Sequence, residues 1–505
     1  MNPLRLLVLA LVSVSVMEAA TFDPLIGDNM VLQRDQPIVI RGRAQPGETV
    51  SARLGPDQGR ATAGPDGAWE VRLRARAASA VPLDLVATGT SGEARARNIL
   101  IGDIWVCAGQ SNIEWPLRLE ASAPEAARML RAPNNLIRLR NHAFPGQYSK
   151  RALTPEQLAE LTPARFFKGS WSVNDAKSAP PFSAVGWWFA QRVQAGAKVP
   201  LGMINWSIGG APIETFIRPE ALAGEPAFAA KLRGDWERNP AIDDWVRQRA
   251  REHFGKAQEP RDERGIEHFY KPGFAWAAGP GQATWMPVRG VLWYQGESNS
   301  LSEPFAREYP GLMKLMVADW RAQWSRPDLP FLWVQLSSID TKGYKSQQWP
   351  LFRDNQRRLL GEIPHSGMAV SSDVGAQNDV HPRDKRTVGE RLARWALHHV
   401  YGQRQVVPSG PLPLAASAGG ASVTVRFAHA KGLRTRDGQA VREVEVAGAD
   451  GAFAPAEAEI RGETLVIRSP APSPTRVRYG WVPWSQANVV NAEGLPASTF
   501  ELEVR

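Results

Sequence analysis

A serine in the segment AGQSN has the first setting along this chain that suits covalent chemistry. Ser111 follows the apolar run ILIGDIWVCAG, which is typical of a buried strand. A sharp turn after such a strand presents the hydroxyl at the edge of a sheet, as a nucleophile requires, and its own N–H can stabilise an oxyanion. The turn alone fits a helix cap equally well, so the assignment depends on the residues that accompany it.

A serine hydroxyl needs a general base near neutral pH, and His381 in QNDVHPRDKRTVGERLARWAL is the best candidate. It lies in a polar loop before a predicted helix that begins near Pro382, and Asp379 lies two residues earlier. No other histidine combines a neighbouring acid with a strand-to-helix loop. The remaining histidines are expected to be structural or exposed: His142, His253, His268, His365, His398, His399 and His429.

A third group must hold the imidazole in the tautomer whose free nitrogen faces the serine. Asp379 is the first choice for this acid. Asp373, at the end of the preceding predicted strand, is the second, and a dyad assisted by a backbone carbonyl is the third interpretation.

Two further motifs offer donors for an oxyanion hole. SIGGAPIE supplies Gly209 and Gly210, whose lack of a side chain allows an N–H to approach a substrate oxygen, and WYQGESN supplies the Gln295 amide. Asn112 and Glu297 are expected to support the site from neighbouring positions. The alternatives are a tight turn for the glycines and a buried hydrogen-bond network for Gln295 and Glu297.

The elements that must position these residues alternate between strand-like and helix-like segments. Apolar runs such as VPLGMINWSIGG, VRGVLWYQGESN and LPFLWVQLSS alternate with amphipathic segments such as YPGLMKLMVADWRAQW. This pattern predicts a three-layer α/β domain over 100–402, with the reactive loops beyond the carboxyl ends of parallel strands. We expect antiparallel β domains at 21–99 and 403–505, and a charged, Trp-containing insertion at about 219–287 that walls the pocket.

The N-terminus has the layout of a secretory signal peptide. Arg5 precedes an apolar run over 6–16, and small residues follow at Ala19 and Ala20. The run is too short to span a bilayer comfortably, so we expect export, with a signal peptide at 1–20 and a periplasmic or secreted mature chain without a membrane segment. A buried first strand is the alternative.

Composition excludes little but restricts the partners. The formal charge is +9, yet Lys and Arg are scattered and no basic run resembles a nucleic-acid arm, so no nucleic-acid partner is expected. Cys107 is the only cysteine, which excludes an intrachain disulfide and favours buried packing for this thiol.

The chain has 19 tryptophans, most of them expected in the core. Those considered for a sugar-binding wall are Trp187, Trp188, Trp206, Trp285 and Trp293. The sequence does not indicate an oligomeric state.

Taken in order, GQSN, SIGGAPIE, WYQGESN and DVHPRDKRTVGERLA resemble the motif set of the sialate O-acetylesterase family within the SGNH hydrolases. The resemblance extends over nearly all of the mature chain. It implies a flavodoxin-like parallel sheet, Ser111 as nucleophile, His381 as base, and an oxyanion hole formed by the Ser111 N–H, a glycine of the 209–210 pair and the Gln295 amide. The implied reaction is hydrolysis of an O-acetylated sugar through an acetyl-enzyme, without a metal or organic cofactor.

The chain departs from this pattern in two places. Many SGNH enzymes have the acid three residues before the histidine, where this chain has Asn378, and the segment EHFYKPGFAWAAGPGQATWMP differs from the expected shorter loop. Sialate, xylan and other acetylated glycans therefore remain alternative substrates. A noncatalytic glycan-binding protein is a competing hypothesis, and an SGNH lipase or thioesterase would require an apolar acyl channel that the charged insertion disfavours.

Overall fold

The computed structural model describes residues 19–90, 92–149, 151–257, 261–340, 346 and 348–505. The predicted signal peptide lies outside the described residues except for Ala19 and Ala20. Within these described ranges, no helix has the length and apolar character needed to cross a membrane.

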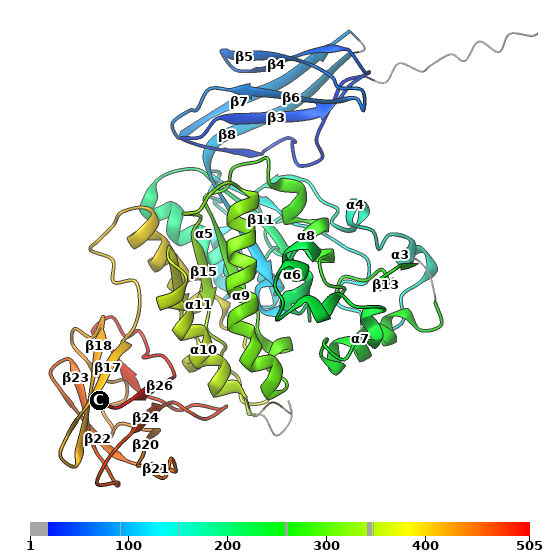
Figure 1. Ribbon diagram of the computed structural model, residues 1–505. Helices are drawn as coiled ribbons and strands as arrows, with labels where there is room; N and C mark the ends of the chain where they lie inside the picture. The colour runs from blue at the N-terminus through cyan, green and yellow to red at the C-terminus, as the bar shows by residue number, and fades with distance from the viewer. Residues whose placement is uncertain (1–18, 91, 150, 258–260, 341–345, 347) are drawn as a thin grey trace, which may run out of the picture.

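A large mixed sheet forms the centre of the molecule (Figure 1). Its strand order is β10-β9-β11-β8-β14-β15-β16, and all neighbours are parallel except β10 and β9. The strands are β8 (Gly92–Gly109), β9 (Ile137–Arg140), β10 (Trp171–Val173), β11 (Leu201–Ser207), β14 (Gly290–Tyr294), β15 (Phe331–Val334) and β16 (Ser366–Ala369). Every residue of β11, β14 and β15 is buried, as expected for parallel strands covered on both faces. The expected mixed α/β class is confirmed.

Helices alternate with the strands of this sheet along the chain. The longest are α5 (Ala184–Ala197), α9 (Glu303–Gln323), α10 (Trp349–Glu362) and α11 (Lys385–Trp395). Helix α5 packs against α11, and α9 packs against α10. The shorter helices are α1 (Ser111–Glu114), α2 (Ala123–Met129), α3 (Pro155–Ala159), α4 (Pro163–Phe166), α6 (Pro219–Gly224), α7 (Asp244–Phe254) and α8 (Phe274–Ala278). The segment 219–287 contains α6, α7 and α8 and lies at one side of the sheet (Figure 1).

The N-terminal part is β-rich. Its strands are β1 (Thr21–Phe22), β2 (Val31–Gln33), β3 (Ile38–Arg43), β4 (Thr49–Leu54), β5 (Asp57–Thr62), β6 (Ala68–Leu73) and β7 (Ser79–Gly89). Strand β8 pairs with β7 and β2 through its first half and with β11 and β14 through its second half. The boundary expected between 99 and 100 therefore lies inside one continuous strand, and the division into domains stays a prediction.

The C-terminal part is also β-rich and has a hydrophobic core of its own, built around Val423, Val425, Leu465, Val477 and Phe500. Figure 1 shows it beside the lower ends of α10 and α11. Its strands are β17 (Leu412–Gly419), β18 (Ser422–Ala428), β19 (Arg434–Thr435), β20 (Val444–Ala447), β21 (Phe453–Pro455), β22 (Glu457–Arg461), β23 (Thr464–Arg468), β24 (Arg476–Tyr479), β25 (Val489–Val490) and β26 (Phe500–Glu503).

Candidate active site

The turn between β8 and α1 brings Ser111 to the carboxyl end of the central strand. Gly109 has φ +128°, and a Cβ there would lie 2.3 Å from the carbonyl oxygen of Tyr294, so only glycine fits. Ser111 begins α1, where the first N–H groups have no acceptor within the helix. Its Oγ lies 2.7 Å from Nε2 of His381, although 270 residues separate the two in sequence. The two residues predicted as nucleophile and base are thus hydrogen-bonded.

Asp379 lies beside His381. Its Oδ1 accepts the His381 backbone N–H at 2.9 Å and lies 3.6 Å from Nδ1 of the imidazole, while about half of the carboxylate side chain is exposed. The Trp115 ring stacks on the imidazole at 5.3 Å between centroids. These contacts restrict the His381 loop on both sides.

Asp373, the second candidate acid, binds two arginines. Its carboxylate accepts hydrogen bonds from Arg391 at 2.6 and 2.8 Å and from Arg436 at 3.1 Å. Burial alone would raise the pKa of Asp373, but the hydrogen bonds and charge of Arg391, together with the charge of Arg436, lower it. This carboxylate is therefore engaged with α11 and the C-terminal part.

Gly209 and Gly210 line the same cavity as Ser111. A Cβ at Gly209 would lie 3.8 Å from Cβ of Ser111. Gly210 has φ +73°, and a Cβ there would lie 2.2 Å from the Tyr270 hydroxyl, which itself donates to the Gly209 carbonyl at 2.8 Å. The glycine pair therefore allows Tyr270 of the insertion to approach Ser111 closely.

Gln295 and Glu297 are buried in a hydrogen-bond network, the alternative considered from the sequence. The Gln295 amide donates to Oδ1 of Asn299 at 2.6 Å and to the Ala211 carbonyl at 3.3 Å, and Gln295 does not line the cavity. Asn112 donates to Glu297 and, at 3.0 Å, to the carbonyl of Val380. The structure brings Asn112 and Glu297 beneath the Ser111–His381 pair but directs the Gln295 amide away from the cavity.

Gln110 is a site residue that the sequence reasoning missed. It lines the cavity next to Ser111, and its Oε1 accepts the N–H groups of Gly296 at 3.1 Å and Ser298 at 3.4 Å. These bonds fix the orientation of the side chain, whose Nε2 has no hydrogen-bond acceptor among the residues that the structure describes. The only signal in the sequence was its place directly before Ser111.

Lys385 was missed as well. It is buried, donates to Oδ1 of Asn112 at 2.5 Å, and lies over the rings of Trp115 and Tyr294. Burial lowers the pKa of Lys385 to about 7, although the charge of Glu297 opposes this effect. Burial also raises the pKa of Glu297. Buried hydrogen bonds from Lys385 to Asn112, and from Asn112 to Glu297 and Val380, thus connect α11 to the loops that follow β14 and precede His381.

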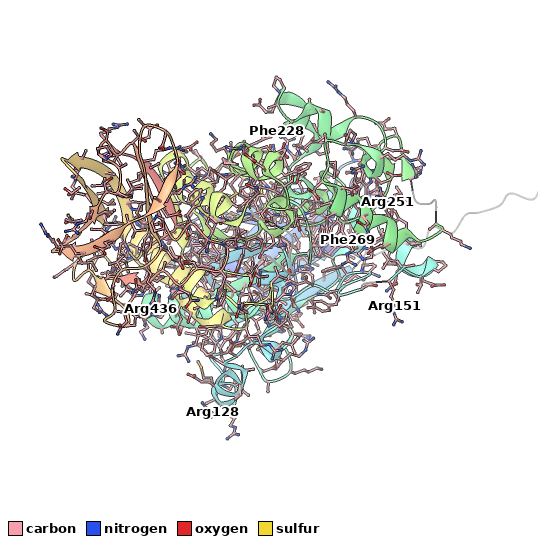
Figure 2. The ribbon with its side chains drawn as sticks, turned by 90° about the horizontal axis from the view of Figure 1, so that it is seen from below. Arg128, Arg151, Phe228, Arg251, Phe269 and Arg436 are labelled. Atoms are coloured by element: carbon pink, nitrogen blue, oxygen red, sulfur yellow. The ribbon has the colours of Figure 1, made fainter. Side chains whose placement is uncertain are left out.

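The cavity at Ser111 and His381 has a volume of about 540 Å³. Its aromatic lining consists of Trp115, Phe144, Tyr148, Trp245, Phe269 and Tyr270. The segment 219–287 contributes Trp245, Phe269 and Tyr270, so this insertion does wall the cavity. Figure 2 shows Phe269 inside the body and Arg251 nearer its edge. None of the five tryptophans considered from the sequence lines this cavity, and four of them, Trp187, Trp188, Trp206 and Trp293, are buried in the core.

Several known proteins are similar to this chain in sequence. The family model described as "Carbohydrate esterase, sialic acid-specific acetylesterase" matches residues 265–398. Sialate O-acetylesterase of Mus musculus is 28% identical over 446 residues, covering 81% of this chain and 78% of that protein, and the Homo sapiens enzyme is 27% identical over 431 residues, covering 78% and 73%.

A solved structure of a carbohydrate acetylesterase from Xanthomonas citri is 32% identical, with a TM-score of 0.77, and the match covers 95% of this chain and 99% of that one. A match that covers nearly all of both chains includes both β-rich parts. The chain therefore belongs to the sialate O-acetylesterase family of carbohydrate esterases and is a carboxylic ester hydrolase.

Proposed function

We propose that this carbohydrate acetylesterase is a serine esterase that hydrolyses O-acetyl esters of sialic acid or a related acetylated sugar through an acetyl-enzyme. The observation that carries the proposal is the 2.7 Å hydrogen bond between Ser111 Oγ and His381 Nε2 inside an aromatic-lined cavity. A hydroxyl bonded to a neutral imidazole nitrogen can lose its proton as it attacks.

In the first half-reaction, Ser111 Oγ attacks the ester carbonyl while His381 Nε2 takes its proton. The tetrahedral intermediate collapses as His381 returns that proton to the sugar oxygen and the bond from carbon to that oxygen breaks. In the second half-reaction, His381 deprotonates a water that attacks the acetyl-serine, and acetate and the free Ser111 hydroxyl form. Asp379 orients the imidazole and stabilises its charged form.

The oxyanion would be stabilised by the Ser111 N–H, a glycine N–H and a side-chain amide. Because the Gly209 N–H bonds to the Glu114 carboxyl, the Gly210 N–H is the glycine donor in this proposal. The open Nε2 of Gln110 supports this residue as the side-chain donor. The bonds of the Gln295 amide to Ala211 and Asn299 support a positioning role for Gln295, through the loop that Gln110 also holds.

The architecture and location belong to the same proposal. The parallel strand order supports a three-layer SGNH-hydrolase unit over 100–402, flanked by β domains at 21–99 and 403–505. The apolar N-terminal run supports export to the periplasm.

The test is acetate release from matched panels of O-acetylated sialic acids and acetylated xylan oligosaccharides, by the mature chain and by Ser111→Ala. We expect release by the wild type and a loss of at least about 10³-fold in the variant. The preferred panel identifies the substrate class. Equal release by both proteins would contradict the nucleophile assignment, and binding of both glycans without release would favour a noncatalytic glycan-binding protein.

A further inference from the structure

Glu114 lines the cavity three residues after Ser111, and its carboxyl takes no part in the steps above. It is only 2% exposed. Its Oε1 accepts a hydrogen bond from Nε2 of Gln147 at 2.8 Å, and the Gly209 N–H also bonds to the carboxyl. A Cβ on Gly209 would lie 2.9 Å from Glu114 Oε2 and 3.8 Å from the Ser111 Cβ. The carboxyl and the nucleophile therefore flank the same glycine.

This carboxyl has no cation partner among the described residues, in contrast to the buried acids Glu214 and Asp354. Glu214 pairs with Lys231 at 2.9 Å, and Asp354 pairs with Arg357 at 2.7 Å. Among the described residues, no positive charge stabilises the Glu114 carboxylate, and burial raises its pKa to about 7. An acid that is costly to bury, unpaired and placed in a ligand cavity has the properties of a ligand-binding group.

The position of the carboxyl defines the ligand chemistry. When an acetyl carbon lies at Ser111 Oγ, the sugar carbon that bears the ester lies one oxygen further away, and a hydroxyl on the adjacent sugar carbon comes next. An acceptor beside Gly209 is within reach of that hydroxyl. We propose that Glu114 accepts a hydrogen bond from the free hydroxyl adjacent to the acetylated position, and so selects sugars acetylated beside an unmodified hydroxyl.

The inference rests on the proposed function, since it needs the acetyl group at Ser111. It adds a substrate rule: monoacetylated vicinal diols are preferred over fully acetylated sugars and over sugars lacking the neighbouring hydroxyl. Glu114 acts on binding and orientation of the sugar, and the proton transfers remain with His381.

The experiment is a cycle of two proteins and two substrates. Wild type and Glu114→Gln are assayed on the monoacetylated methyl glycoside that the wild type hydrolyses fastest, and on the analogue with hydrogen in place of the adjacent hydroxyl. A hydrogen bond to a charged group corresponds to roughly 10- to 100-fold in kcat/KM. We expect the wild type to lose this factor on the deoxy analogue. Glu114→Gln keeps only a neutral amide oxygen as acceptor, so it should show most of the loss already on the normal sugar and lose less than the wild type on the analogue.

Two controls separate the possible failures. Glu120→Gln changes a buried carboxyl that accepts from Trp188 and does not line the cavity, so its substrate ratio should equal that of the wild type. p-Nitrophenyl acetate has no neighbouring hydroxyl, so Glu120→Gln and the wild type should hydrolyse it at rates within about 3-fold of each other, which checks that the control variant keeps its esterase activity. The inference would be overturned if Glu114→Gln lowered kcat/KM equally on both sugars. It would also be overturned if the wild type hydrolysed the deoxy analogue with the same kcat/KM as the normal sugar. Activity in Ser111→Ala would instead contradict the proposed function.

Discussion

Replacing Glu114 by Gln should remove a loss of stability that the wild type undergoes as pH rises from 5 to 8. Burial raises the pKa of this carboxyl from 4.5 to about 7 in the folded state. Between these two pH values the folded chain holds a proton that the unfolded chain has lost, so wild-type stability falls as pH rises. Each pKa unit corresponds to about 1.4 kcal/mol, which gives a loss of about 3 kcal/mol by pH 8 as an order of magnitude. Glutamine has the same shape and carries no charge, so the variant avoids this loss.

The assay is urea unfolding of both proteins at pH 5 and pH 8, followed by tryptophan fluorescence. The difference in free energy of unfolding, variant minus wild type, should rise by about 2.5 kcal/mol between the two pH values, because part of the loss has already occurred at pH 5. Glu457→Gln, an exposed change in β22, is the control and should show the same difference at both pH values. A difference for Glu114→Gln that stays constant with pH, or falls, would refute the claim that an unpaired carboxyl is buried at this site.

Three further predictions concern the site. Gln110→Ala should lower kcat by roughly 100-fold with little change in KM, as expected for loss of one oxyanion donor, and unchanged kcat would remove Gln110 from that role. Asp379→Ala should cost far less than the roughly 10⁴-fold loss known for a buried triad aspartate, because this carboxylate is half exposed and 3.6 Å from Nδ1, and steady-state kinetics would show it. Because the folded pKa of Lys385 is about 7, wild-type stability should rise from pH 7 to pH 10. Lys385→Met should abolish that rise in urea unfolding and, by releasing Asn112, lower kcat; a rise that persists would contradict the burial of this ammonium.

The sequence was sufficient for the features that depend on local pattern. Buried strands that end in GQSN and SIGG are read from continuous apolar runs followed by glycine, and parallel strands bring such ends together. The pairing of Ser111 with His381 followed from chemistry, since one serine in a strand-end turn and one histidine beside an acid left few combinations. The structure places these two atoms at hydrogen-bond distance.

The missed features depend on contacts between distant segments. Gln110 and Gln295 both follow a strand, so the sequence does not distinguish them. The packing of the 296–298 loop does: it holds Gln110 at the cavity, while the Gln295 amide bonds to Asn299. Lys385 lies in a polar stretch that gives no sign of burial, because Asn112 and two aromatic rings surround it from other parts of the chain. Trp115, whose ring stacks on the His381 imidazole, lies outside the buried strands and helices. Those segments drew attention to the other tryptophans.

The most direct test of the serine mechanism is to trap the intermediate. The wild type is mixed with an acetylated sugar, quenched in acid within one turnover, and analysed by peptide mass spectrometry. We expect one added acetyl group on the peptide that contains Ser111, and none in Ser111→Ala. An acetyl group on another residue, or full turnover of the substrate by Ser111→Ala, would contradict the assignment of Ser111 as the nucleophile.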